Sequence, residues 1–152
     1  ATETPAIIAK RGTEEVAALG DFGEKLGMAY QLYDDWQSIW GAQEKTGKRA
    51  AGDIYERKKT LPVIHAREQL TGTDRVRLIS LYGKDALQAA DVEEVLGLFE
   101  KAGAKEALEK RAAAYKEAAL AALSVSGLSQ ETKEILEKAA TALVPDSVTA
   151  SR

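Results

Sequence analysis

The sequence of 152 residues contains no cysteine, a single histidine and only three prolines. The lack of cysteine excludes a disulfide framework and a metal site built on thiolates. No run of about 18 apolar residues occurs, so we expect no transmembrane helix. Residues 1–12 contain only the short apolar run 6–9, so we expect no secretory signal either. These absences favour a cytoplasmic protein.

An excess of basic charge is also missing, because 21 lysines and arginines stand against 24 aspartates and glutamates, for a net charge of -3. This balance argues against nucleic acid as the main partner. With 45% hydrophobic and 30% charged residues, the composition is that of an ordinary globular chain. We therefore expect one domain, or part of one, over residues 1–144, followed by a polar, frayed tail at 145–152.

Apolar residues recur at three- and four-residue steps through most of the chain, and no segment alternates as a β-strand does. Alanine, leucine, glutamate and lysine dominate the composition, and all four are tolerant of or favourable to helix. The predicted class is all-α. The expected helices cover 13–40, about 60–69, 74–82, 91–102, 104–123 and 130–144, with caps at Asp74, Asp91 and Ser129 and a polar connection at 42–58. The stripes expected to face inward are Leu108, Ala112, Tyr115, Ala119 and Leu123, and on the last helix Ile135, Leu136, Ala139 and Leu143.

Three glycines, Gly20, Gly23 and Gly27, fall on or near one stripe of the first long helix. Each costs up to about 1 kcal/mol of helix stability relative to alanine. Their spacing suggests that another helix or a ligand approaches this stripe closely, and a loosely packed helix is the alternative. We expect Gly23 and Gly27 to leave room for a substrate.

Two adjacent carboxylates, Asp34 and Asp35, stand in an otherwise apolar and aromatic run. Asp34 shares a helix face with Tyr30 and Gln31, one turn earlier, whereas Asp35 lies about 100° further round. Burying such a pair is costly unless a metal or basic groups compensate the charge. The face of Asp34 is therefore expected to form the wall of a cavity. A solvated pair on the helix surface is the competing interpretation.

A basic stretch follows the carboxylates, because residues 41–60 contain six basic and three acidic residues. Lys58 and Lys59 precede a predicted helix start, where cations oppose the helix dipole unless an anion occupies the site. Carboxylates that hold a divalent metal beside such lysines suit a polyphosphate ligand, and a solvated loop is the simpler alternative. Asp53 fits an N-cap, a water-mediated metal contact or a lysine partner. The six basic residues are Lys45, Lys48, Arg49, Arg57, Lys58 and Lys59.

Other catalytic patterns are weak or missing. His65 lies between Ile64 and Ala66 on an apolar helix, where a packed histidine is a better expectation than a catalytic one. The sequence has no P-loop, no nucleophile elbow and no HExxH motif.

The runs YQLYDDWQSIWG and KTGKRAAGDIYERKKTLPVIHA together resemble the second aspartate-rich region of the trans-isoprenyl diphosphate synthases, the family of farnesyl and geranylgeranyl diphosphate synthases. That region has an FQ pair, a DDxxD motif, a loop with GK and D, and a KxT-[L/Y]-P element. The residues that match these elements in order are Tyr30 and Gln31, Asp34 and Asp35, Lys48, Asp53, and residues 58–62. The segment 91–123 is similar to the family's C-terminal helices, so the resemblance covers nearly the whole chain.

Two departures from the family pattern matter. Ser38 stands at the third aspartate of DDxxD, which weakens metal contact there. The family's first DDxxD, the arginines after it and the residues that set product length belong to an N-terminal half, and no second acidic cluster replaces them in this chain. We interpret the chain as the C-terminal half of an isoprenoid synthase helical bundle, either a fragment or a subunit that needs a partner.

The resemblance implies a prenyltransferase that uses Mg²⁺ to condense isopentenyl diphosphate with an allylic diphosphate. It implies that Asp34 binds magnesium directly and that Asp35 assists through water or hydrogen bonds. Lys48 and Lys58 would contact the allylic diphosphate, and Tyr30 and Gln31 would shape the region where the new bond forms. The implied catalytic set is Asp34, Lys48 and Gln31. The implied partners are the two diphosphates, the missing N-terminal half or a partner subunit, and a second copy in a homodimer of the complete enzyme.

Two alternatives stay open. A class I terpene cyclase on the same scaffold is compatible with the loss of the third aspartate. A non-catalytic helical regulatory subunit is also possible, but it would not need Lys48, Asp53 and Lys58. Magnesium-dependent diphosphate binding would separate the enzymes from the regulatory subunit. Products formed with and without isopentenyl diphosphate would separate the synthase from the cyclase.

Overall fold

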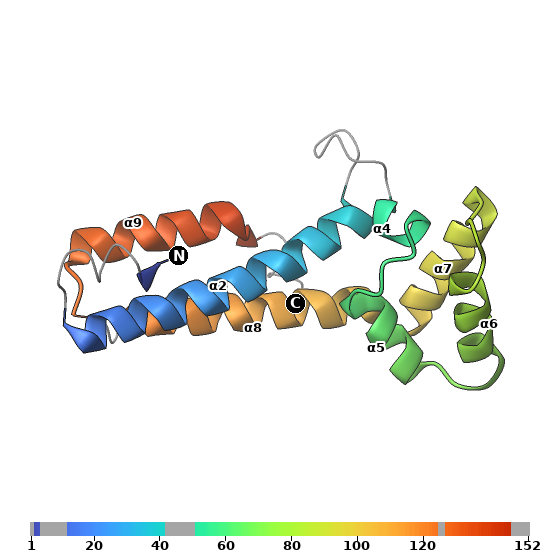
Figure 1. Ribbon diagram of the computed structural model, residues 1–152, viewed down its shortest axis with the longest axis horizontal. Helices are drawn as coiled ribbons and strands as arrows, with labels where there is room; N and C mark the ends of the chain where they lie inside the picture. The colour runs from blue at the N-terminus through green and yellow to red at the C-terminus, as the bar shows by residue number, and fades with distance from the viewer. Residues whose placement is uncertain (1, 4–11, 42–50, 125–126, 147–152) are drawn as a thin grey trace. The chain divides into compact units, whose positions relative to one another are not determined.

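The computed structural model describes residues 2–3, 12–41, 51–124 and 127–146 (Figure 1). This part of the chain is helical and contains no strand, which confirms the predicted all-α class. The helices are α2 (Thr13–Trp40), α4 (Gly52–Tyr55), α5 (Leu61–Gln69), α6 (Gly72–Tyr82), α7 (Ala89–Lys101), α8 (Ala104–Ser124) and α9 (Gln130–Leu143).

Several predicted helix ends are confirmed, because local signals were strong there. The long helix α2 ends at Gly41, and Gly103 separates α7 from α8 with a φ of 64°, a left-handed conformation that glycine adopts without strain. Ser129 is the N-cap of α9, and its side-chain oxygen accepts a hydrogen bond from the Thr132 backbone N–H at 3.3 Å.

Three predictions about helix starts were wrong. Asp74 does not cap α6, which begins at Gly72 and so contains Asp74 in its first turn. Asp91 does not cap α7 from outside but lies in its first turn, where its Oδ2 accepts from the backbone N–H of Gln88 at 3.0 Å. The connection predicted as polar contains the short helix α4, which is four residues long and therefore too short for a periodic signal.

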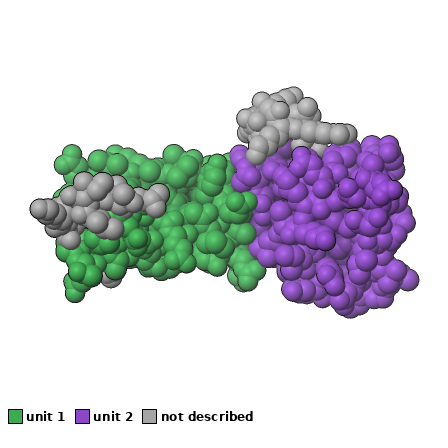
Figure 2. Space-filling view, viewed as in Figure 1, with its two compact units in different colours: residues 1–33, 110–152 green, residues 34–109 purple. Residues whose placement is uncertain are grey.

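The chain divides into two compact units, one of residues 1–33 and 110–152 and the other of residues 34–109 (Figure 2). We call them unit 1 and unit 2. The boundaries fall inside α2 and inside α8, so each of these helices contributes residues to both units. The single domain expected over 1–144 stays a prediction, and residues 147–152 of the expected tail lie outside the described residues.

Unit 1 has a core made of apolar side chains from three helices. The buried residues are Phe22, Leu26 and Ala29 from α2, Ala119, Ala122 and Leu123 from α8, Ala140 from α9, and Val144 just after α9. The inward stripe predicted for α8 is confirmed in both units, since its small and aliphatic members are almost fully buried and Tyr115 packs against the core.

The inward stripe predicted for α9 was mostly wrong. Ile135 is 59% exposed, Leu143 is 44% exposed and Ala139 is also exposed. The buried positions are Ala140 and Val144, with Leu136 partly buried, as residues four apart on one helix face should be. Two apolar stripes lie side by side on α9, and periodicity alone does not say which one meets the neighbouring helices.

A buried lysine joins α8 to the end of α9 within unit 1. Lys116 is 5% exposed, and its ammonium donates to the Val144 backbone oxygen at 2.7 Å and to Asp146 Oδ1 at 2.5 Å. The Val144 carbonyl follows the last turn of α9, where a cation is favoured by the helix dipole and satisfies a backbone oxygen that lacks a helical partner. The charge of Lys116 is thus compensated where it is buried.

The glycine stripe of α2 is approached closely at two of its three members. A methyl group built on Gly20 would overlap the Glu3 side chain, and one on Gly23 would overlap Thr2 Oγ1, which donates to the Leu19 backbone oxygen at 2.6 Å. Gly27 has nothing within 4 Å of the equivalent position. Close approach is therefore confirmed at Gly20 and Gly23, where residues of this same chain make it, and the space beside Gly27 is open.

Unit 2 is built around α7. Helices α5, α6 and α7 pack against one another and α4 packs against α7, as Figure 1 also shows. The centre of the core contains Ile54, Leu78, Leu81, Val95 and Phe99, all 2% exposed or less. Trp40, at the end of α2, packs its ring against that of Phe99 with centroids 6.2 Å apart. This packing positions the end of α2 and the segment 51–60 in one unit.

Candidate functional site

The two adjacent carboxylates of α2 have different environments. Asp35 is buried, with 6% of its surface exposed, whereas Asp34 is only partly buried. Ser38, one turn after Asp34, is also buried at 5%. The pair is therefore not the solvated surface pair of the competing interpretation. It consists of one carboxylate turned into the protein and one at its surface.

The tryptophan after this pair is anchored within unit 2. Trp36 Nε1 donates a hydrogen bond of 2.9 Å to Oε1 of Glu109, a carboxylate on α8 that is 6% exposed. The Lys105 ammonium lies 5.7 Å from the centroid of the Trp36 ring and 4.0 Å from the same Glu109 oxygen. Because Trp36 directly follows Asp34 and Asp35, these contacts restrain the turn of α2 that carries them. Sequence reasoning missed Glu109, since an acid 73 residues away gives no local signal.

The turn of α2 before the carboxylates presents exposed residues. Tyr30 is 46% exposed, Gln31 and Gly27 are exposed, and Met28 is 44% exposed. An exposed tyrosine and methionine beside an open glycine are unusual on a helix whose other face is a core. This face of α2 has the small and amphipathic residues of a cavity wall.

The segment after α4 contains a second charged pair. Lys58 Nζ lies 2.7 Å from Asp53 Oδ1 and 3.2 Å from Glu56 Oε2. The hydrogen bond from Asp53 is the main cause that raises the pKa of Lys58, with Glu56 adding to it against the opposing effect of desolvation. Of the three roles open for Asp53, the structure shows the lysine partner, and the N-cap position of α4 belongs to Ala51. Lys58 therefore stays protonated at neutral pH.

The backbone between Asp53 and Lys58 is strained at one residue. Arg57 has a φ of 54°, the left-handed conformation that costs an ordinary residue roughly 1–2 kcal/mol. Its guanidinium Nη1 donates to the backbone oxygen of Lys84, while its Nε is buried without a hydrogen-bond partner among the described residues. The contact with Lys84 connects the loop before α5 to the segment between α6 and α7.

Tyr82 is a residue near this segment that sequence reasoning missed. Its hydroxyl is buried and has no hydrogen-bond partner among the described residues, and the same holds for Thr60 Oγ1. Burial and, second to it, the charge of Asp53 raise the pKa of the Tyr82 hydroxyl. Tyr82 is the last residue of α6, so only the packing of α6 in unit 2 brings it within the field of Asp53.

The remaining predicted residues are settled as follows. Lys48, with Lys45 and Arg49, lies outside the described residues, so its predicted contact with diphosphate stays a prediction. His65 Nε2 lies 3.1 Å from the backbone oxygen of Ala102. This contact between α5 and the end of α7 agrees with a packed structural histidine.

The donor set suits magnesium in only one way. Within the described ranges, no three histidine, aspartate or glutamate side chains group closely enough to hold a metal ion. Magnesium, however, is typically bound by one or two carboxylates together with water and the phosphate oxygens of a substrate, and not by a complete protein cage. Asp34 and Asp35 supply hard oxygen ligands of the kind that such a shared site requires.

Comparisons with known proteins identify the family. The sequence model of the family described as Polyprenyl synthetase matches residues 1–99. The chain is 39% identical over 106 residues to the short chain isoprenyl diphosphate synthase of Methanothermobacter thermautotrophicus, which covers 70% of this chain and 32% of that protein. It is 37% identical over 119 residues to the geranylgeranyl diphosphate synthase of Mycobacterium tuberculosis, covering 78% of this chain and 34% of that protein.

The fold leads to the same family. The crystal structure of geranylgeranyl pyrophosphate synthase from Corynebacterium glutamicum, complexed with isoprenyl diphosphate and magnesium, superposes with a TM-score of 0.81 at 26% identity. That match covers 91% of this chain and 39% of the other. This chain belongs to the polyprenyl synthetase family, as its motifs predicted. It spans about a third of the length of the two curated relatives.

None of the helices in the described part of the chain combines the length and apolar character needed to cross a bilayer. The prediction of no transmembrane helix is thus confirmed for those residues.

Proposed function

We propose that the complete protein to which this chain belongs is a cytoplasmic, magnesium-dependent trans-isoprenyl diphosphate synthase. It condenses isopentenyl diphosphate with an allylic diphosphate, and this chain supplies the second aspartate-rich region of its active site. The missing N-terminal half, or a partner subunit, supplies the first. The observation that carries the proposal is the occurrence, in one compact unit matched by the family, of the Asp34–Asp35 pair and the Asp53–Lys58 pair.

The carboxylates would hold the metal. Asp34, partly exposed on α2, is the direct ligand, and the buried Asp35 assists through water or hydrogen bonds. Magnesium bound there supplies Lewis-acid polarisation and neutralises charge on the leaving diphosphate. The anchoring of Trp36 by Glu109 supports this role, because a metal ligand has to be held in place before the substrate arrives.

Lys58 would bind the allylic diphosphate. Its side chain is 49% exposed while the side chain of its partner Asp53 is 8% exposed. A protonated amine with one face on a buried carboxylate and the other open is suited to bind a second anion. Lys48 would contribute a further cation to the same diphosphate.

Tyr30 and Gln31 would shape the space where the new bond forms. Both are exposed on α2, in keeping with a wall that another part of the complete protein covers. The aromatic and apolar residues around them exclude water from a reaction in which positive charge develops on carbon. Gly27 leaves open space on this side of the helix.

The test is an assay of the protein encoded by the complete reading frame, with isopentenyl diphosphate and geranyl or farnesyl diphosphate, in magnesium and in EDTA. We expect a chain-elongated allylic product that requires magnesium. Asp34→Asn should lower kcat/KM by about a hundredfold or more, because it removes a charged contact made to the developing leaving group, without loss of helical circular dichroism. The control is Asp21→Asn, which lies on the same helix and pairs with the exposed Lys25.

Normal turnover of Asp34→Asn would remove this aspartate from the site. Product made from the allylic diphosphate alone would identify a cyclase, and a complete protein that binds no diphosphate in magnesium would identify a regulatory subunit. Both of these alternatives lack support among the relatives described above, which are named as diphosphate synthases.

A further inference from the structure

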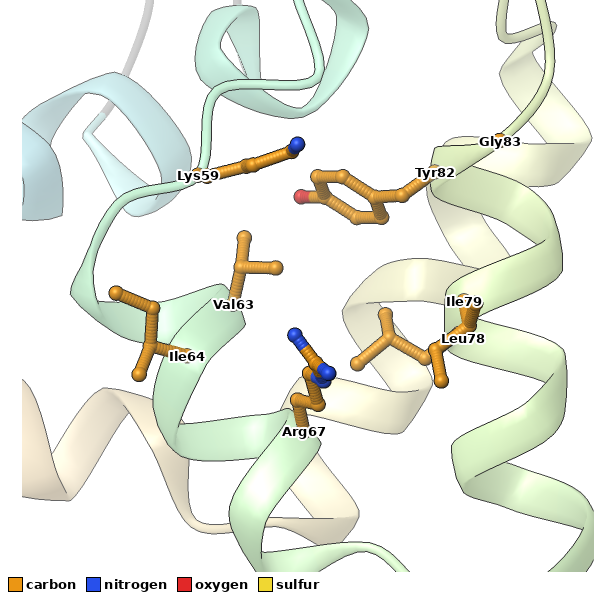
Figure 3. Close-up of a pocket in the computed structure, with 8 residues that line it drawn as sticks. All are labelled: Lys59, Val63, Ile64, Arg67, Leu78, Ile79, Tyr82 and Gly83. Atoms are coloured by element: carbon orange, nitrogen blue, oxygen red, sulfur yellow. The ribbon is translucent and has the colours of Figure 1, made fainter.

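A cavity of about 320 Å³ lies between α5 and α6 in unit 2 (Figure 3). Four aliphatic side chains form its walls, Val63 and Ile64 from α5 and Leu78 and Ile79 from α6. Leu78 and Val63 are buried, whereas Ile64 is 47% exposed and Ile79 is 51% exposed. Apolar walls that stay half open are costly in water, and a cavity of this size is within the range of small-molecule sites.

Two cations line the same cavity, and no acid does. Lys59 comes from the segment before α5 and Arg67 from the last turn of α5. Neither forms an ion pair with another described residue. Figure 3 shows the Arg67 guanidinium rising from α5 into the space between Val63 and Leu78, and the Lys59 ammonium extending toward Tyr82. The two positive charges therefore converge on a lining that is otherwise apolar.

The adjacent lysines of the sequence thus separate in the structure. Lys58 is paired with Asp53 and Glu56, while Lys59 faces the cavity. Asp53 is the acid whose charge acts on Tyr82, and Lys58 already compensates it. Its presence near the cavity consequently leaves the charge of Lys59 and Arg67 available.

Tyr82 closes the end of the cavity next to Lys59. Its hydroxyl points toward the Lys59 side chain in Figure 3 and is buried without a hydrogen-bond partner among the described residues. A buried hydroxyl without a partner has a free-energy cost of about 1–3 kcal/mol. A ligand oxygen that accepted its hydrogen bond would remove that cost.

We propose that this cavity is a binding site for a small amphipathic anion. The carboxylate, sulfate or phosphate head would lie between Lys59, Arg67 and the Tyr82 hydroxyl, and a short apolar chain would lie on Val63, Ile64, Leu78 and Ile79. The lining combines two unpaired cations, a donor without an acceptor and four aliphatic walls, which matches this class of ligand and disfavours cations and purely polar anions. The site is distinct from the carboxylates of α2 and does not depend on the proposed synthase activity.

The experiment is an NMR titration of the 152-residue chain, labelled at isoleucine, leucine and valine methyl groups, with n-octyl phosphate below its micellar concentration. We expect saturable shifts at the methyls of Val63, Ile64, Leu78 and Ile79. Inorganic phosphate supplies the head alone, n-octanol the chain alone, and octyltrimethylammonium the opposite charge. Each of these three probes should bind at least about tenfold more weakly, the effect of losing one charge-assisted contact or several buried methylenes.

Variants locate the site. Arg67→Gln and Lys59→Gln should each raise the Kd for octyl phosphate about fivefold or more, and Arg75→Gln, an exposed cation on α6 outside this lining, should not. Ile79→Trp should fill the cavity and abolish the shifts. Val76→Trp is its control, since Val76 is 68% exposed on the same helix and does not line this cavity. The methyl spectrum of each variant without ligand reports whether it is folded.

Three results would overturn the proposal. The first is the absence of saturable shifts at these four residues in the wild-type chain. The second is equal affinity for octyl phosphate and octyltrimethylammonium, which would leave the cations without a role. The third is binding unchanged in a folded Arg67→Gln, Lys59→Gln double variant.

Discussion

Lys58 Nζ lies 2.7 Å from Asp53 Oδ1, in a pair whose acid is 8% exposed and whose amine is 49% exposed. The acid is therefore fixed inside the protein, while the amine keeps an open face. This asymmetry distinguishes the pair from an ordinary surface salt bridge, in which both members are solvated and little is gained. Several expectations depend on it and on three other contacts of this chain.

Replacing Lys58 by alanine in the complete protein should weaken binding of the allylic diphosphate. We expect KM for that substrate to rise about tenfold or more, because a charge-assisted contact is lost, with a smaller change in kcat. Steady-state kinetics at low ionic strength is the measurement, and Lys101→Ala, which removes an exposed lysine paired with Asp74, is the control. An unchanged KM at low salt would mean that the segment is a solvated loop.

The same pair predicts a pH effect. Asp53 raises the pKa of Lys58, so the contribution of the pair is complete below the pKa of a lysine in the unfolded chain, about 10.4. It is lost as pH rises through the higher folded value. Asp53→Asn should lower the pKa of Lys58, which can be followed from the ¹³Cε shift of that lysine. A pKa of Lys58 that does not move would show that Glu56 or other groups hold the charge.

Acid should weaken unit 2 through Asp91. Lys84 donates to Asp91 Oδ1 at 2.5 Å and the Gln88 backbone N–H to Oδ2 at 3.0 Å, and in this order they lower the pKa of Asp91. A lowered pKa stabilises the fold above the pKa of an unfolded aspartate, and the contribution disappears as pH falls through the folded value. We expect Asp91→Asn to reduce the loss of thermal stability between pH 7 and pH 3. Asp85→Asn, an exposed neighbour, should not, and equal pH profiles for both variants would contradict the assignment.

Arg57 allows the strained backbone to be tested apart from its side-chain contact. Arg57→Gly and Arg57→Ala both remove the hydrogen bond to Lys84, but only glycine adopts a φ of 54° without strain. We expect the glycine variant to be more stable than the alanine variant by about 1 kcal/mol, measured by urea unfolding monitored by circular dichroism. Equal stabilities would mean that the backbone relaxes out of the left-handed conformation.

Lys116→Ala should destabilise unit 1. It leaves the buried Val144 oxygen without its donor, a loss of about 1–3 kcal/mol in the free energy of unfolding. Lys110→Ala on the same helix removes an exposed lysine and should change stability by less than about 0.5 kcal/mol. If the two variants unfold at the same urea concentration, the buried contact contributes nothing to stability.

Much of the fold could be predicted from the residues because its signals are local. The glycines after α2 and α7 and the serine before α9 end or begin helices through their own backbone and side-chain properties. Caps failed where two candidates lie within one turn, as at Asp74 and Asp91, since a side chain in the first turn serves as well as one before it. The four-residue helix α4 is too short to produce any period.

The candidate site could be predicted in part for the same reason. Asp34, Asp35, Tyr30, Gln31, Lys58 and Asp53 belong to one continuous motif, so they were found together. Glu109 and Tyr82 were missed, because each reaches its partner only through the packing of helices distant in sequence.

The sequence by itself determined that this protein is helical, that it belongs to the polyprenyl synthetase family, and which residues carry its acidic and basic motifs. These are properties of composition and of spacing along the chain. Only the tertiary structure decided that Asp35 is buried and Asp34 less so, that Lys58 faces an acid while Lys59 faces a cavity, and which stripe of α9 meets the core. The physical reason is that burial and pairing depend on which distant surfaces come together, and adjacent residues on a helix or loop can face opposite sides of such a contact.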